Sequence, residues 1–238
     1  MPDAAPEVTQ AAITALYRET IADRMSVIGP LLGSTTRVLD VGCVDARTGR
    51  EDSAERVVRK ANALHRQIVK LAPRTLGADI DEAGVKALNA AGYRCVAANA
   101  EEMDLGERFD VIVAGEVIEH LDNCGAFLRT MHRHLTPTGR LVISTPNPFY
   151  AAQTWKIWRH GMPQVHEDHT NWQDPLTLGR LLDRCDFEQE SGYWVQSTPN
   201  AKAWKRHLRP YFAKSFLAVA RPKGAAASER VNRVRVAA

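Results

Sequence analysis

An α/β fold built on a doubly wound, mostly parallel sheet is predicted by three features of the sequence. Five short apolar runs between residues 37 and 145 alternate with stretches of helical spacing, as in strands joined by crossover helices. Polar residues or glycine follow most of these runs, and the carboxyl ends of parallel strands are where such sheets bind ligands. Two later strand-like segments, at 191–197 and 215–220, bring the expected total to seven, with an antiparallel edge strand.

The elements of the first 145 residues follow in a regular order. Apolar residues at helical spacing predict one long helix over 7–29. Strands are then expected at 37–42, 75–80, 93–98, 109–114 and 140–145, with helices at 61–72, 81–92 and about 124–135. The segment Thr136-Pro137-Thr138-Gly139 is typical of a turn before the fifth strand.

The chain changes character after the fifth strand. Residues 146–172 show no periodic pattern and hold three tryptophans, Trp155, Trp158 and Trp172. Asp174-Pro175 then begins a helix, with Asp as the N-cap and Pro at the first helical position. We therefore expect one domain over 1–221, with a small substrate cap inserted at about 146–172, followed by a flexible basic tail over 222–238.

Charge and cysteine content limit the function classes. The formal net charge is +3, with 31 basic and 28 acidic side chains. Residues 222–238 contain four basic and one acidic residue, so the rest of the chain is neutral. A neutral body does not favour a nucleic-acid partner. The four cysteines form no CxxC pair, and no secretory leader or membrane-spanning apolar run is present, so we expect free thiols, a cytoplasmic location and no membrane contact.

Polar residues follow four consecutive strands of the predicted sheet. Asp40, Gly42 and Cys43 lie at the first strand end, Asp79 at the second, Asn99-Ala100-Glu101 at the third, and Glu116 at the fourth. An acid at the second strand end suits a ribose diol, and an Asn acceptor suits an adenine amino group. No GxGxxG or GxxxxGK[ST] motif is present. The pattern therefore favours a nucleoside that carries an amino acid and no phosphate.

Five segments carry a resemblance to a known family. VLDVGC, GADID, ANAEEMD, FDVIVAGEVIEHL and GRLVISTPN occur in this order over residues 37–147. Together they resemble the class I S-adenosylmethionine-dependent methyltransferases, in particular the ubiquinone-type small-molecule O-methyltransferases, which have a Rossmann-like sheet. The resemblance implies S-adenosyl-L-methionine as cofactor and S-adenosyl-L-homocysteine as product. It implies that the methionine end of the cofactor is lined by Asp40, Gly42 and Cys43, and that the region beneath the methionine is lined by Glu116. It also implies that Asp79 binds the ribose hydroxyls and that the adenine contacts Ile80, Asn99 and Ala100.

A base for the acceptor is expected beyond the fifth strand. His166 and His169 lie in VHEDHTNW, and a histidine that titrates near neutrality can take a proton from a hydroxyl. His169 is the first choice, because it precedes Trp172 and the capped helix. The tryptophans are interpreted either as walls for an aromatic or sugar acceptor or as packing within the cap. The leading hypothesis is methyl transfer to a hydroxyl of a small molecule or sugar.

Two alternatives remain open. Glu116, Glu119 and His120 share one helical turn and could meet His166 or His169 around a divalent metal. That arrangement is similar to the small-RNA 3′-terminal 2′-O-methyltransferases, and so implies a metal-assisted RNA ribose 2′-O-methyltransferase. We expect no metal, since metal-free relatives share the EVIEHL string. The second alternative is a non-catalytic binding protein, because Val44 and Ala46 replace two glycines that the family has. The oligomeric state is not indicated.

Overall fold

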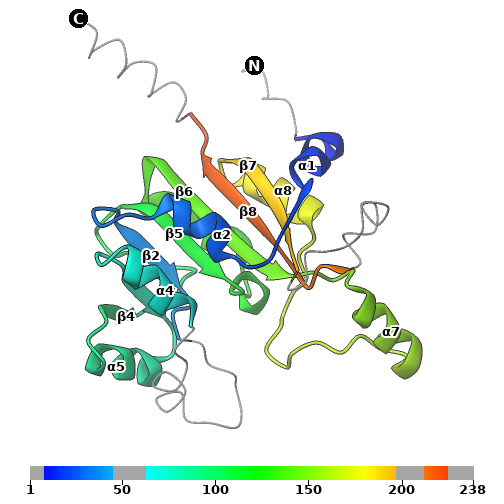
Figure 1. The fold of residues 1–238 in the computed structure, drawn as a ribbon, viewed down its shortest axis with the longest axis horizontal. Helices are drawn as coiled ribbons and strands as arrows, with labels where there is room; N and C mark the ends of the chain where they lie inside the picture. The colour runs from blue at the N-terminus through cyan, green and yellow to red at the C-terminus, as the bar shows by residue number, and fades with distance from the viewer. Residues whose placement is uncertain (1–7, 45–62, 197–211, 225–238) are drawn as a thin grey trace, which may run out of the picture.

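One mixed sheet forms the centre of the molecule. The computed structural model describes residues 8–44, 63–196 and 212–224, and in these ranges eight strands join in the order β1-β7-β8-β6-β5-β2-β3-β4 (Figure 1). The strands are β1 (Glu19–Ile21), β2 (Val38–Val41), β3 (Leu76–Asp79), β4 (Cys95–Ala97), β5 (Phe109–Gly115), β6 (Leu135–Pro146), β7 (Phe187–Val195) and β8 (Ser215–Pro222).

The predicted fold class is confirmed, with one addition. All seven expected strands are present, and every neighbouring pair is parallel except those that include β8. The antiparallel strand β8, expected at the edge of the sheet, lies between β6 and β7, and the unpredicted β1 pairs with β7 in parallel and forms that edge. The two late strands therefore extend the parallel sheet at the end away from β4.

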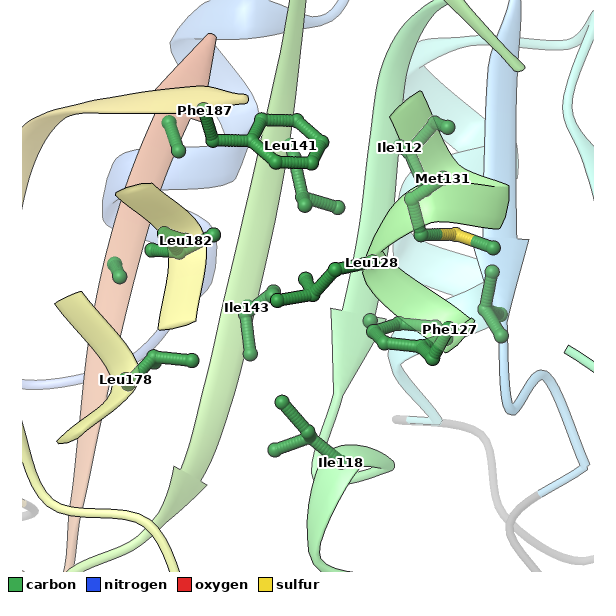
Figure 2. Packing of buried hydrophobic residues seen from close by; sticks show 14 of the residues in the cluster. Ile112, Ile118, Phe127, Leu128, Met131, Leu141, Ile143, Leu178, Leu182 and Phe187 are labelled. Atoms are coloured by element: carbon green, nitrogen blue, oxygen red, sulfur yellow. The ribbon is translucent and has the colours of Figure 1, made fainter. Parts of the chain in front are cut away.

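Helices cover both faces of this sheet. The described helices are α1 (Gln10–Leu16), α2 (Met25–Ile28), α4 (Leu64–Leu71), α5 (Glu82–Ala90), α6 (Cys124–His134), α7 (Ala151–His160) and α8 (Pro175–Arg184), with short 3-10 turns η1 (Gly29–Leu31) and η2 (Ile118–His120); all of these helices except α7 lie against the sheet. Phe127 and Leu128 of α6 and Leu178 of α8 pack on one face (Figure 2). Ile28 of α2 and Ile68 of α4 pack on the other. Burial of both faces explains why the central strands are almost continuously apolar.

The prediction of one helix over 7–29 was wrong. The structure has α1, then β1, then α2. Tyr17, which follows α1, packs against the rings of Trp194 and Phe216, at centroid distances of 5.5 and 5.9 Å. The Trp194 indole also donates to the Tyr17 carbonyl oxygen. These contacts with distant strands hold Glu19–Ile21 beside β7, so tertiary pairing overrides the helical pattern.

Two further segments differ from their predictions. Residues 151–160 form helix α7, where irregular structure was expected; none of its residues is buried, and it lies apart from the sheet (Figure 1). Residues 136–139 lie within β6, although the pairing with β5 jumps from Leu135 to Arg140. The apparent turn is thus an irregularity inside a strand.

Asp174 caps α8 as predicted, in a capping box with Thr177. Most of the expected basic tail, from residue 225 onward, lies outside the described residues.

Candidate functional site

Gly42 lies where the carboxyl end of β2 opens to solvent. Its φ is +75°, and an added Cβ would stand 2.4 Å from the Cγ2 of Val117. Glycine is required here both by the backbone conformation and by the close side chain. Gly42 is also exposed, so its backbone is accessible to a ligand at this edge of the sheet.

Asp79 and Ile80 form the next part of this edge. The Asp79 carboxylate accepts hydrogen bonds from the backbone N–H of Val44 at 2.8 Å and of Asp81 at 3.0 Å. Burial raises the pKa of Asp79 above its usual value, and these two hydrogen bonds oppose the rise. Ile80 beside it is 74% exposed. A half-buried acid thus adjoins an exposed apolar side chain. The acid suits a hydrogen bond from a sugar hydroxyl, and the apolar side chain suits contact with a flat ring.

The third strand end forms a polar turn. The side-chain oxygen of Asn99 accepts from the backbone N–H of Glu101 at 3.0 Å. Glu101 in turn accepts from the backbone N–H groups of Asp122 and Asn123. Glu101 therefore ties this turn to the loop after β5. Asn99 and Ala100 are both half-buried.

Asp40 and Cys43, both expected at the methionine end, lie deeper than the rest. Asp40 is 2% exposed, and its carboxylate lies 2.8 Å from Nδ1 of His65 on α4. Cys43 is 5% exposed and packs with Val44 and residues of α5. Their side chains are therefore engaged inside the fold, while Gly42 between them is exposed.

Glu116, after β5, is paired with a cation that the sequence reasoning missed. Its backbone has φ +59°, and its carboxylate lies 3.6 Å from the guanidinium of Arg24. Arg24 also donates to the Ser144 hydroxyl at 3.2 Å, and Ser215 donates to Glu116 at 3.1 Å. Arg24 lies just before α2, inside the segment predicted to be one helix, and no local signal marks it as a site residue.

Three histidines and one acid gather after β5 and in the cap. Donor atoms of Glu119, His120 and His169 all lie within 4.8 Å of one another. The rings of His120 and His169 are 4.7 Å apart, and the His166 ring is 5.6 Å from that of His169. The sequence placed these residues together as an alternative, and the structure brings them together; Glu116, the fourth residue of that alternative, lies outside the group of donors.

The two inner members of this group have shifted pKa values. Glu119 is 2% exposed and accepts from the Thr145 hydroxyl at 2.9 Å. Burial raises the pKa of Glu119 to about 7. Partial burial, together with the neighbouring His120 and His166, lowers the pKa of His169. Both effects favour the neutral form of His169, which can accept a proton, over the charged form.

A cavity of about 120 Å³ adjoins these residues. Its lining includes Glu119, Thr145, His166, His169, Asn171 and Trp172. Trp155 and Trp158 do not line it; they are 57% and 76% exposed and contact each other at a ring distance of 4.9 Å. Of the three tryptophans considered for an acceptor site, only Trp172 borders this cavity.

Two cap residues that the sequence reasoning missed hold η2 in place. Thr170 donates its hydroxyl to the carbonyl oxygen of Leu121 at 2.9 Å. Asn171 donates to the carbonyl oxygens of both Ile118 and Leu121 at 2.9 Å. Their backbone N–H groups bond the carbonyl of Glu119. They fall between His169 and Trp172 in HTNW, where polar loop residues are too common to stand out.

This sheet order, with polar residues at neighbouring strand ends beside a histidine-lined cavity, defines a Rossmann-like enzyme class that binds a nucleoside cofactor. The family model described as "Methyltransferase domain" matches residues 14–191. The chain belongs to this family, the class I S-adenosylmethionine-dependent methyltransferases, as its sequence motifs implied.

Curated relatives and solved structures agree with this assignment. An enzyme named ubiquinone biosynthesis O-methyltransferase from Rhodopseudomonas palustris is 31% identical over 77% of this chain and 70% of its own length. A protein of the same name from Bradyrhizobium diazoefficiens is 31% identical over 50% of this chain, but only 42% of its own length is matched. The crystal structure of a SAM-dependent methyltransferase from Archaeoglobus fulgidus, 17% identical, has a TM-score of 0.56 and covers 83% of this chain and 91% of that one. Among the helices in the described ranges, none has the length and apolar character to span a membrane.

Proposed function

We propose that the protein transfers a methyl group from S-adenosylmethionine to a hydroxyl of a small molecule or sugar, with His169 as the general base. The observation that carries the proposal is the cavity at the ends of β5 and β6, which His169 lines. His169 has a lowered pKa, and its ring is held in the group that includes His120 and His166. His166 is the second candidate base.

The strand-end residues fit the cofactor. Gly42 is exposed and has no side chain, and an added Cβ would clash with Val117. Its bare backbone permits close approach of the amino-acid part of the cofactor. Asp79 would accept from the ribose hydroxyls, and Ile80, with Asn99 and Ala100, would border the adenine. Asp40 and Cys43, being buried, would support the Gly42 backbone from behind. When bound, the cofactor supplies a methyl group on a positively charged sulfur.

The ion pair after β5 suits the charged end of the cofactor. An amino acid carries an ammonium and a carboxylate, and Arg24 and Glu116 present one charge of each sign 3.6 Å apart. We assign Glu116 to the ammonium and Arg24 to the carboxylate. The remaining task for the protein is to orient the acceptor and remove its proton.

One specific observation favours a second candidate, metal-assisted transfer. Glu119, His120 and His169 offer one carboxylate oxygen and two imidazole nitrogens within 4.8 Å, a donor set that suits divalent cations of the first transition row. These three residues would hold the cation, which would polarise an acceptor hydroxyl. The shared chemistry is deprotonation of a hydroxyl, and the two candidates differ in whether His169 is a base or a ligand.

Calorimetric titration with S-adenosylhomocysteine tests the cofactor site directly. We expect binding by the folded protein; no heat from a folded sample would contradict both catalytic candidates and favour the non-catalytic alternative. Methyl transfer to a panel of phenols, catechols and sugars is then measured with EDTA and with added Mg²⁺ or Mn²⁺. Activity that survives EDTA supports His169 as base, whereas activity that requires the added ion supports the metal candidate.

The names of the relatives indicate the class of acceptor. The curated proteins reported above are named O-methyltransferases of ubiquinone biosynthesis, and we infer from them a small hydroxyl acceptor for this chain. An RNA acceptor belongs to the metal-assisted alternative, and a cytoplasmic location stays a prediction.

A further inference from the structure

A chain of three polar side chains lies behind the cofactor edge of the sheet. Nδ1 of His65 lies 2.8 Å from the Asp40 carboxylate, and the other ring nitrogen, Nε2, lies 3.7 Å from the sulfur of Cys95. Asp40 and His65 are each 2% exposed, whereas Cys95 is half-buried. An acid, an imidazole and a thiol in this order resemble the arrangement that activates a nucleophilic sulfur.

A second thiol reaches the same place because a strand residue lacks a side chain. Gly77 of β3 is paired with Asp40 on one side and Cys95 on the other. A Cβ on Gly77 would lie 2.7 Å from the sulfur of Cys43 and 2.7 Å from the sulfur of Cys95. The two sulfurs are therefore no more than 5.4 Å apart, which is twice 2.7 Å.

The electrostatics make the two thiols unequal. The neighbouring Cys43 thiol lowers the pKa of Cys95, with a further contribution from His65, although burial opposes the shift. Burial alone would lower the pKa of His65, but hydrogen bonds to Asp40 and Cys95 raise it to about 9. The pKa of Cys43 is raised. Because the His65 ring contacts the sulfur of Cys95, the thiolate form is favoured at Cys95 over Cys43.

We propose that Cys95 is an oxidation site for peroxides, with Cys43 as the resolving thiol and the Asp40–His65 pair as the positioning group. The Cys95 thiolate attacks the O–O bond of hydrogen peroxide, becomes a sulfenic acid and releases hydroxide. The Cys43 sulfur then attacks the Cys95 sulfur, the S–S bond forms, and the sulfenic oxygen leaves as water with the Cys43 proton. The two thiols lose two electrons in all, and the peroxide is reduced to water.

The Cys43–Cys95 pair differs from the other two cysteines of the chain. Cys124 is half-buried and Cys185 is buried. Burial raises the pKa of both thiols. They therefore serve as internal references within the same sample.

Intact-mass and peptide analysis after treatment with hydrogen peroxide tests the site. We expect a loss of about 2 Da, the two hydrogens removed on disulfide formation, and one cross-linked peptide pair that joins Cys43 to Cys95. Cys95→Ser should abolish the mass loss, whereas Cys124→Ser should keep it. Absence of this disulfide, or cross-links without preference among the four cysteines, would overturn the proposal.

Thiol labelling with iodoacetamide at neutral pH tests the role of His65. Cys95 in the untreated protein should react about tenfold or more faster than Cys124, because the thiolate is the reactive form. His65→Asn should remove most of that advantage and leave the Cys124 rate unchanged. Equal rates at Cys95 and Cys124 in the wild-type protein would contradict the proposal, even if the His65 variant does not fold.

An effect of this disulfide on cofactor binding rests on the proposed function. Cys43 directly follows Gly42, so the cross-link should shift the cofactor edge and weaken S-adenosylhomocysteine binding about tenfold or more. Titration of the reduced protein separates the two claims. If the reduced protein does not bind, the proposed function fails while the mass result still decides the oxidation site. If the oxidised protein binds equally well, only the proposed effect on binding is overturned.

Discussion

The proposed cofactor end of the site, from Gly42 to Ala100, and the proposed acceptor end, from Glu119 to Asn171, are built by different means. At the cofactor end the residues lie at the carboxyl ends of β2, β3 and β4, and the pairing of these neighbouring strands brings them together. At the acceptor end η2 is tied by hydrogen bonds to cap residues about 50 positions later in the chain. Strand order therefore fixes the first end, whereas side-chain contacts between distant segments fix the second. A substitution at one end should consequently leave the other intact.

Loss of the proposed base should have the largest effect and should be confined to the acceptor end. We expect His169→Ala to reduce kcat by about 10²- to 10⁴-fold, the usual contribution of general-base catalysis. Affinity for S-adenosylhomocysteine should stay within about twofold. Steady-state kinetics and calorimetry measure the two quantities.

The matched control for that variant is His160→Ala, an exposed histidine at the end of α7 that does not line the cavity. It should leave kcat unchanged. If His166→Ala abolishes turnover while His169→Ala does not, the assignment of the base moves to His166. A large loss of cofactor affinity in His169→Ala would mean that the two ends are coupled.

Removal of Asp79, the acid at the end of β3, tests the cofactor end. Asp79→Ala should weaken S-adenosylhomocysteine binding by about 1 to 3 kcal/mol, as expected for lost hydrogen bonds to a charged group. The loss should appear in affinity measured by calorimetry. Asp81→Ala is the matched control, because Asp81 caps α5 through Gly84 and is not among the proposed ligands. Unchanged affinity in Asp79→Ala would show that the ribose does not meet this residue.

The sequence predicted these two ends unequally, for a physical reason. The strands that position Asp79 and Asn99 have local apolar patterns, and parallel strands end at the same edge. Thr170 and Asn171 at the acceptor end, and Arg24 beside Glu116, owe their positions to tertiary contacts, which leave no periodic trace. The same cause explains the helix wrongly predicted over 7–29, where pairing of β1 with β7 prevails. The engagement of Asp40 with His65 also follows from packing on α4 and is not visible in the motif.

The burial of Glu119 should give the acceptor end a pH-dependent stability. The folded protein binds the Glu119 proton more tightly than the unfolded chain, because burial raises the pKa to about 7. The free energy of unfolding should therefore fall as pH rises from about 4.5 to about 7. The total change is about 3 to 4 kcal/mol, because the pKa rises from 4.5 to about 7 and one pKa unit corresponds to about 1.4 kcal/mol.

Glu119→Gln should remove that slope and stabilise the protein above pH 7, because the amide is neutral at every pH and can still accept from Thr145. Urea unfolding in EDTA at pH 5 and pH 8 measures the effect. Glu167→Gln, at an exposed cap residue, is the control and should keep the wild-type slope. A slope that persists in Glu119→Gln would assign the titration to another group.

The smallest effect is expected where the cap holds η2. Asn171→Ala removes two hydrogen bonds, to the carbonyl oxygens of Ile118 and Leu121, and should lower the free energy of unfolding by about 1 to 2 kcal/mol. Because η2 carries Glu119 and His120, the variant should also raise KM for the acceptor while the affinity for S-adenosylhomocysteine stays constant. Gln164→Ala, which changes the cavity lining without touching η2, provides the comparison. A change in cofactor affinity in Asn171→Ala would show that the cap also orders the strand ends, so the two ends would no longer be separable.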